Sequence, residues 1–239
     1  MSMMLAAPMM MSQPVAYFGD IPDDFVARYL FDGDFADEAG AFHGANVGST
    51  FLSSGDGPGG TDVGINTGGG AKYVDLPVAL AAELESAATI SFAVRVQSTA
   101  AVAIVLAGSD ISSFTRFFIV EFGNGSNLFP RVVSSPAGST SIYRSAVAGV
   151  VNAWHHVVIR TTGGSTNFRF SGVNVPLGVD AGADGGAFFG DVESIDKMRI
   201  GYLDRSSYDT GGSPFDLAFL TLYDRYLPDA ECAALEGEW

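Results

Sequence analysis

From residue 25 onward, short stretches of the chain alternate apolar and polar positions with a period of two. Residues 89–96 place Ile90, Phe92 and Val94 on one face of a predicted strand. Residues 117–122, 141–147, 154–161, 167–170, 197–202 and 218–223 follow the same pattern, and clusters of Gly, Ser, Asn and Asp separate them. Many short strands at this spacing predict an all-β sandwich or barrel.

One convincing helix is predicted, at the C-terminal end. Asp229 and Glu231 bring negative charge to its first turn, and Pro228 suits its first position. Cys232 and Trp239 fall on one helical face together with Leu235. The chain has no second cysteine, so we expect Cys232 to be a buried small hydrophobe.

Residues 1–24 form a different kind of segment. They are rich in methionine, contain three prolines and show neither a helical nor an alternating period. No Lys or Arg precedes Arg28, so the positive region of a secretory signal is missing. We predict an extended arm (1–24) before one domain (25–239), the arm lying either on its own domain or on another subunit.

Charge narrows the set of partners. The net charge is −15, with 27 acidic residues against 12 basic ones. This balance argues against nucleic acid and anionic membranes as partners, and it leaves carboxylates that could hold a hard cation such as calcium. The longest apolar run, residues 100–107, is too short for a membrane span, so we predict no membrane insertion.

The strand 152–159, which reads Asn-Ala-Trp-His-His-Val-Val-Ile, resembles the "W-H-H-V-A" strand of laminin-G-like, concanavalin A-like jelly-roll domains. Other stretches continue the likeness in family order: 28–33 with 37–40, 73–77, 89–95, 167–172, 198–201 and 217–235. The resemblance spans residues 25–239. It implies a two-sheet antiparallel jelly-roll β-sandwich with an N-terminal extended arm and a short C-terminal helix.

Metal chemistry has two candidate origins. His155 and His156 are adjacent on a strand, so their side chains point to opposite faces and cannot hold one ion together. Several laminin-G-like domains bind calcium at a sandwich rim, and the resemblance makes two groups of aspartates candidate ligands here: Asp32, Asp34 and Asp37, and Asp204, Asp209 and Asp216. The alternative is that Asp32 and Asp37 fasten the first turn by accepting backbone N–H bonds.

Glycan binding on such folds uses aromatic faces and polar side chains on long loops. Two loops offer these groups. The candidate residues are Asn124, Asn127, Phe129 and Arg131 in residues 123–131, and Tyr202, Asp204, Arg205 and Tyr208 in residues 202–208.

Catalysis is not expected. Glycoside hydrolases of this fold carry a Glu-x-Asp-x-x-Glu strand, and the nearest acidic pairs here, Glu83 with Glu85 and Glu193 with Asp196, have the wrong spacing or setting. We therefore predict a non-catalytic binding or structural module displayed on a large assembly. The preferred setting is a bacteriophage virion surface, as head decoration or tail adhesion, with the arm contacting other subunits and the domain touching cell-surface glycans. A secreted or cell-surface lectin, and an unrecognised glycoside hydrolase, are the alternatives.

Overall fold

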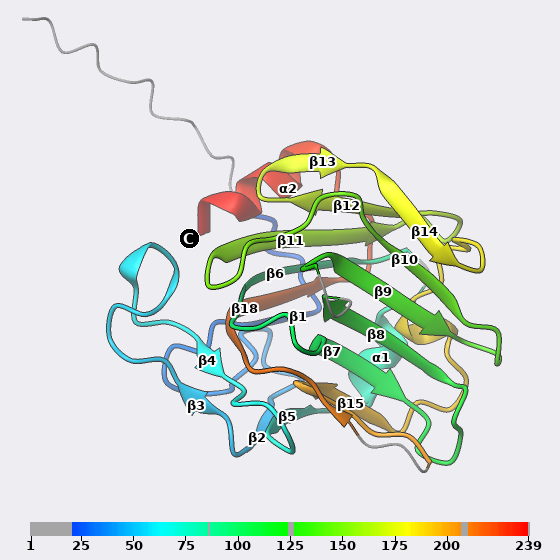
Figure 1. The fold of residues 1–239 in the computed structure, drawn as a ribbon, viewed down its shortest axis with the longest axis horizontal. Helices are drawn as coiled ribbons and strands as arrows, with labels where there is room; N and C mark the ends of the chain where they lie inside the picture. Colours follow the sequence, from blue (N-terminus) through cyan, green and yellow to red (C-terminus); the bar gives the residue numbers. More distant parts are fainter. Residues whose placement is uncertain (1–20, 86, 124–126, 207–209, 239) are drawn as a thin grey trace, which may run out of the picture.

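The computed structural model describes residues 21–85, 87–123, 127–206 and 210–238. Within them the predicted sandwich is confirmed: two eight-stranded sheets, A and B, stack face to face (Figure 1). All paired strands are antiparallel. A separate two-stranded hairpin is formed by β16 (Tyr202–Leu203) and β17 (Thr210–Gly211).

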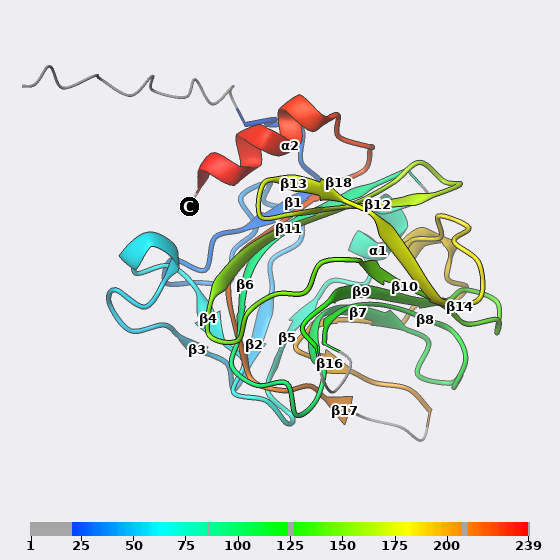
Figure 2. The same cartoon turned by 45° about the horizontal axis from the view of Figure 1, so that its top comes forward.

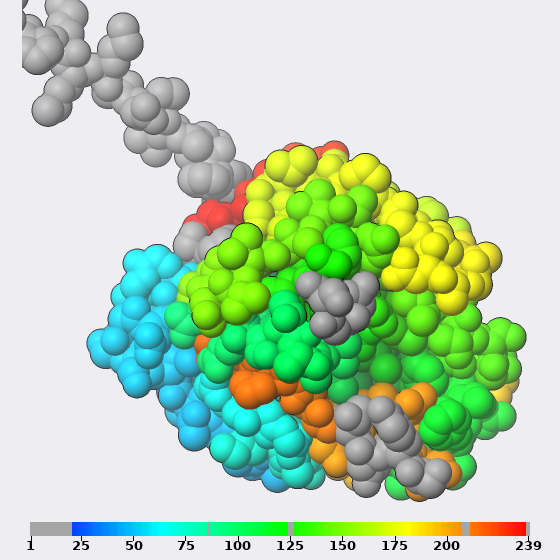
Figure 3. Space-filling view, in the orientation of Figure 1, coloured from blue at the N-terminus to red at the C-terminus, as the bar shows by residue number. Residues whose placement is uncertain are grey.

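Each sheet draws its strands from distant parts of the chain. Sheet A has the order β13 (Val173–Val175), β12 (Thr166–Phe170), β11 (Trp154–Thr161), β6 (Thr89–Val96), β18 (Phe215–Tyr223), β4 (Ile65–Asn66) and β3 (Thr50–Phe51), with β1 (Ala27–Tyr29) also paired to β18. Sheet B has the order β14 (Leu177–Ala181), β10 (Ser141–Ser145), β9 (Pro130–Ser135), β8 (Phe117–Phe122), β7 (Ala103–Ser109), β15 (Lys197–Ile200), β5 (Tyr73–Leu76) and β2 (Ala45–Val47). The consecutive strands β13 and β14 form one edge of each sheet and close that side of the sandwich (yellow in Figure 3).

The inward faces of the two sheets make the main core. In sheet A, Phe92 of β6 lies between Val157 of β11 and Leu220 of β18. All three are buried with Val105 and Phe118 of sheet B in one apolar cluster. Each large apolar side chain removed from water contributes roughly 1.5–3 kcal/mol, so this alternating inward set is what holds the sheets together.

The outer face of sheet A is partly covered by α2 (Asp229–Leu235), as Figure 2 shows. Cys232 and Leu235 of the helix pack on Val158 and Tyr223, which confirms the predicted buried thiol. Pro228 lies at the N-cap, one position before the one predicted, because its backbone is still extended. Trp239 lies outside the described residues. The other helical segments are α1 (Ala79–Glu83), η1 (Pro58–Gly60), η2 (Phe189–Asp191) and η3 (Glu236–Glu238).

Residues 21–25 lie against the same region as α2. Ile21 packs on the cluster around Tyr223, whose hydroxyl donates a 3.1 Å hydrogen bond to the Pro22 carbonyl. Asp24 pairs with Arg225 at 2.6 Å, and this hydrogen bond lowers the pKa of Asp24. The last residues of the predicted arm therefore lie on their own domain, while residues 1–20 fall outside the described part of the chain.

The adjacent histidines point to opposite faces, as predicted. His155 lies inward, stacked 4.9 Å from Phe170. The outward His156 contacts the Ser91 hydroxyl through Nε2 at 2.8 Å. Burial lowers the pKa of both rings, and that of His156 falls to about 3, so both are neutral core groups at pH 7.

Asp37 organises the turn after β1. Its buried carboxylate accepts hydrogen bonds of 2.8–3.1 Å from four backbone N–H groups, those of Arg28, Ala39, Ala41 and Phe42. For Asp37 the fastening role expected from the sequence is confirmed. Asp34, by contrast, is exposed and accepts one bond, from the Ala36 N–H.

Replacing Asp37 by alanine should destabilise the domain by about 3 kcal/mol, because four backbone N–H groups lose their charged, buried acceptor together. Urea denaturation of the full chain measures the loss. The matched control, Asp34→Ala, removes one exposed bond and should cost less than about 1 kcal/mol. Equal losses in the two variants would contradict this account of the turn.

Acid sensitivity should depend on His156. Its pKa is 6.5 in an unfolded chain and about 3 when folded, so the folded state binds this proton less readily. Stability is therefore complete above pH 6.5 and is lost as the pH falls, by up to about 1.4 kcal/mol per pH unit. In unfolding titrations between pH 6.5 and 5, His156→Gln should show a shallower decline than the natural chain. An unchanged slope would mean that His156 is not the source.

Candidate functional site

The outer surface of sheet B, here called the sheet B face, consists of the outward side chains of β5, β15, β7, β8, β9 and β10 with the β16–β17 hairpin. Its centre is apolar: Ile104, Ala107, Phe117, Ile119 and Val133 form a buried cluster with Leu203 of β16. Leu203 thus fixes the hairpin across the sheet, on the side away from sheet A (Figure 2). The loop predicted to bind glycan is attached to the sheet at this point.

Arg199 is the centre of the first polar group on this face. Its guanidinium donates to Asp75 at 2.6 Å and to Asp204 at 2.8 Å, and it lies 4.2 Å from the centre of the Tyr73 ring and 5.6 Å from that of Tyr202. Burial works against the charge, yet the Asp75 hydrogen bond and the nearby carboxylates raise the pKa of Arg199. The result is a permanently charged group held between two rings.

Arg205 forms a second group with two phenylalanines. Its guanidinium lies 4.4 Å from the ring centre of Phe117 and 4.7 Å from that of Phe114, and it donates to the Phe114 carbonyl at 3.2 Å. Phe114 remains 53% exposed. An aromatic ring stiffened by an arginine is therefore open to solvent here.

A third group couples β9 and β10 to the edge strand β14. Arg144 stacks over Phe129 at 4.3 Å and pairs with Asp180 at 2.9 Å. Phe129 is half-buried, and the neighbouring Asn127 is exposed. Among the predicted glycan-binding residues, Asn124 and Tyr208 lie outside the described residues.

Arg131, the remaining predicted glycan contact, has a different environment. It pairs at 2.6 Å with Glu121 of β8, and the two side chains are only 15% and 7% exposed. Burial raises the pKa of Glu121 while the arginine opposes the rise. The charge of Arg131 is thus used to neutralise a buried carboxylate within the face.

The structure does not bring the predicted calcium ligands together. Asp32 and Asp34 are exposed in the first turn, Asp37 serves the backbone, and Asp204 pairs with Arg199. Asp209 lies outside the described residues. Over the described ranges, no group of three His, Cys, Asp or Glu side chains could hold a metal ion.

Asp216 was predicted as a rim oxygen, and the structure corrects this. It is buried on the outer face of sheet A, where it pairs with Arg95 at 2.6 Å and accepts from Gln97 and Asn66. The reason is that β18 begins at Phe215, which draws Asp216 out of the loop and into the sheet.

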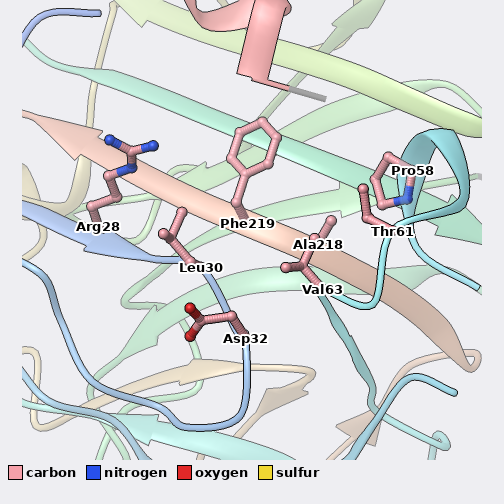
Figure 4. Close-up of a pocket in the computed structure, with 8 residues that line it drawn as sticks. All are labelled: Arg28, Leu30, Asp32, Pro58, Thr61, Val63, Ala218 and Phe219. Atoms are coloured by element: carbon pink, nitrogen blue, oxygen red, sulfur yellow. The ribbon is translucent and has the colours of Figure 1, made fainter. Parts of the chain in front are cut away.

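A hollow of about 190 Å³ lies on the outer face of sheet A. Figure 4 shows the residues that line it. Ala218 and Phe219 of β18 form its floor. Its walls come from the strand and turn around β1 and from the loop 58–63, through Arg28, Leu30, Asp32, Pro58, Thr61 and Val63. This pocket was not predicted from the sequence.

Several residues of the sheet B face were also missed: Tyr73, Asp75, Phe114, Arg144 and Arg199. Tyr73 and Asp75 occupy alternate positions of one strand, and Arg199 lies between the apolar Met198 and Ile200 of another. Alternation could have placed these three side chains outward. It could not have shown that Arg199 meets Asp75, which lies 124 residues earlier.

No protein-family model matches this chain, and no curated protein does either. Solved structures do resemble it. Domain 4 of AbnA, a GH43 extracellular arabinanase from Geobacillus stearothermophilus solved with arabinotriose, has a TM-score of 0.63 at 17% identity, covering 89% of this chain and 98% of that one. The CBM40 of the Ruminococcus gnavus IT-sialidase, bound to α2,3-sialyllactose, has a TM-score of 0.58 at 18% identity, covering 73% and 97%.

Trypanosoma rangeli sialidase, solved in complex with sialic acid, is similar over 91% of this chain but only 33% of its own length, with a TM-score of 0.63 and 15% identity. At these identities the likeness establishes the shared β-sandwich fold, and the laminin-G-like family itself stays a prediction. In the described part of the chain, no helix is long and apolar enough to cross a membrane.

The buried ion pair of Glu121 and Arg131 leads to a testable prediction about the stability of the domain. Arg131→Met should destabilise the domain by about 3–5 kcal/mol at pH 7, because Glu121 is left charged and buried. Without Arg131 the pKa of Glu121 rises further, so the folded state takes up a proton and the deficit shrinks as the pH falls from 7 to 5. Chemical denaturation at the two pH values measures this.

The matched control is the double variant Glu121→Leu with Arg131→Met, which removes both charges and should recover most of the lost stability. A deficit that is the same at both pH values, or that persists in the double variant, would contradict the pairing.

Proposed function

We propose that this chain is a non-catalytic carbohydrate-binding module that acts outside the cell and contacts glycans through its sheet B face. The observation that supports the proposal most directly is the set of three arginine–aromatic groups on that face. They are centred on Arg199, Arg205 and Arg144, and each is fixed by hydrogen bonds or ion pairs. Sugar rings present C–H surfaces that pack on aromatic rings and hydroxyls that need oriented polar groups.

The exposed and half-buried rings are the proposed stacking surfaces. Phe114, stiffened by Arg205, and Phe129, stiffened by Arg144, lose little conformational freedom when a ligand arrives. Both lie beside strands that are fixed by the core, so the ring positions are set before binding. We expect modest affinity at a single site, which several copies or a second domain would raise by avidity.

Three acids of this face favour binding over hydrolysis. Asp75 and Asp204 both accept from Arg199, and Glu121 is buried against Arg131. A glycosidase needs one free nucleophile and one carboxyl that delivers a proton to the leaving group. These three carboxylates are instead acceptors for arginines, which suits a module without catalytic function.

The compared structures support the proposal through their own ligands. Arabinotriose is bound to the arabinanase domain and sialyllactose to the CBM40, and both are β-sandwiches of this fold. The wider hypothesis of display on a bacteriophage virion, with residues 1–24 contacting other subunits, has no support from those structures and stays a prediction. The glycan-binding module is the function that the described residues favour.

A glycan array followed by calorimetry, with arabinotriose and α2,3-sialyllactose among the probes, tests the proposal. Phe114→Ala and Phe129→Ala should each weaken binding of the recognised glycan about tenfold, because a stacked ring contributes about 1–1.5 kcal/mol. Thermal stability should change little, since neither ring belongs to the main core.

Val173→Ala is the matched control, since Val173 is 62% exposed but lies on the edge strand of sheet A. It should leave the affinity unchanged. Glycan binding that survives both phenylalanine substitutions would remove the sheet B face from the proposal, and the absence of any bound glycan would remove the function.

A further inference from the structure

The pocket on the outer face of sheet A is an apolar site that neither α2 nor the glycan proposal uses. Its floor is formed by Ala218 and Phe219, and Leu30, Val63 and Pro58 stand around it (Figure 4). The hollow of about 190 Å³ is large enough for one long side chain.

The apolar character of this region extends beyond the pocket. Ala93, Ala218 and Phe219 form a buried cluster with the partly buried Leu30 and Trp154. The helix α2 packs on a separate cluster, around Val158 and Tyr223. The helix α2 therefore covers one part of the outer face of sheet A, while the apolar hollow over Phe219 lies in a part that α2 does not cover.

The chain contains a segment whose chemistry matches this hollow. Residues 1–12 hold six of the seven methionines, and no charged side chain occurs before Asp20. Methionine is unbranched and polarizable, so it fills irregular apolar gaps and packs well against aromatic rings such as Phe219. An uncharged segment also avoids the repulsion expected in a protein of net charge −15.

The segment is attached on the correct face. Ile21 and Pro22 lie beside Tyr223, and Phe219 is four residues earlier on the same strand, facing the same side. Four strand residues span about 13 Å. Residues 13–20 can extend to about 26 Å, so residues 1–12 can reach the pocket without any change in the domain.

We propose that this pocket binds the methionine-rich residues 1–12 of the same chain, with one methionine side chain occupying the hollow over Phe219. The short tether places the segment at an effective concentration in the millimolar range, so weak contacts suffice. Docking there covers the apolar part of the sheet A surface and leaves the sheet B face free.

Methyl-labelled methionine NMR on the full chain tests the proposal. Met198 is 1% exposed in the main core and provides an internal reference for a buried methyl. At least one of the other six methyls should shift upfield from the free-peptide position, through the ring current of Phe219. It should also show nuclear Overhauser contacts to the methyl groups of Leu30 or Val63.

Two variants block the pocket in different ways. Thr61→Trp fills it from the exposed rim, and Leu30→Asp makes its wall polar. Both should return the shifted methyl to the free position and leave Met198 unchanged, which shows that the fold is intact. The matched control is Val78→Trp, at an exposed residue of a second apolar groove beside α1, and it should preserve the shift.

Three results would overturn the proposal. The six methyls could all lie at the free-peptide position, or the shift could persist in both pocket variants. A shift that disappears on dilution would show that a second copy supplies the segment, which contradicts docking within one chain.

Discussion

The packing of the two inward sheet faces is the constraint on which the rest of this structure depends. At the centre of sheet A, Phe92 lies between Val157 and Leu220, and all three face the strands of sheet B. Because strand side chains alternate, this inward set also fixes the outward one. A slip of one residue in β6 would turn Arg95 into the core and Phe92 toward solvent, so the core fixes the register of every polar group on the outer surfaces.

The outward-facing side chains of the two sheets are covered and paired in different ways. On sheet A, α2 and residues 21–25 bury an apolar strip, and Arg95 forms an ion pair with Asp216 toward the opposite ends of β6 and β18. On sheet B, Leu203 covers the apolar centre, while arginines are held by carboxylates and aromatic rings around it. In this chain with 27 acidic residues, many arginines therefore lie in close contact with a carboxylate. Because these ion pairs are partly buried, dissolved salt screens their attraction less than it would screen a fully exposed pair.

The sequence predicts those features of this architecture that depend on residues close together in the chain, and it does not predict those that depend on distant residues. The alternating strands such as β6, β8 and β11, the final helix and the opposed directions of His155 and His156 rest on local periodicity, so they could be predicted. The strands β7 and β9 were not predicted, because nearly all of their residues are buried and no alternation marks them. The partner of Arg199 lies 124 residues away in the chain and that of Arg95 121 residues away. Such pairs depend on which strands become neighbours, and alternation within a strand carries no information about that. The rim role expected of Asp216 failed for the same reason, because the start of β18 is set by pairing with β4 and β6.

The arrangement separates two surfaces by a rigid core. Sheets in a sandwich lie about 10 Å apart and are packed at the density of a crystal, so a ligand on one outer face changes little on the other. Phe219 on sheet A and Phe114 beside sheet B belong to different apolar groups with the main core between them. A contact made at the sheet A pocket therefore competes with nothing on the sheet B face. A module built this way can hold an apolar segment on the outer face of sheet A while the arginine-stiffened rings of the sheet B face remain available to a ligand. Both outer faces exist because the alternation of strand side chains that buries Phe92 directs every second side chain outward.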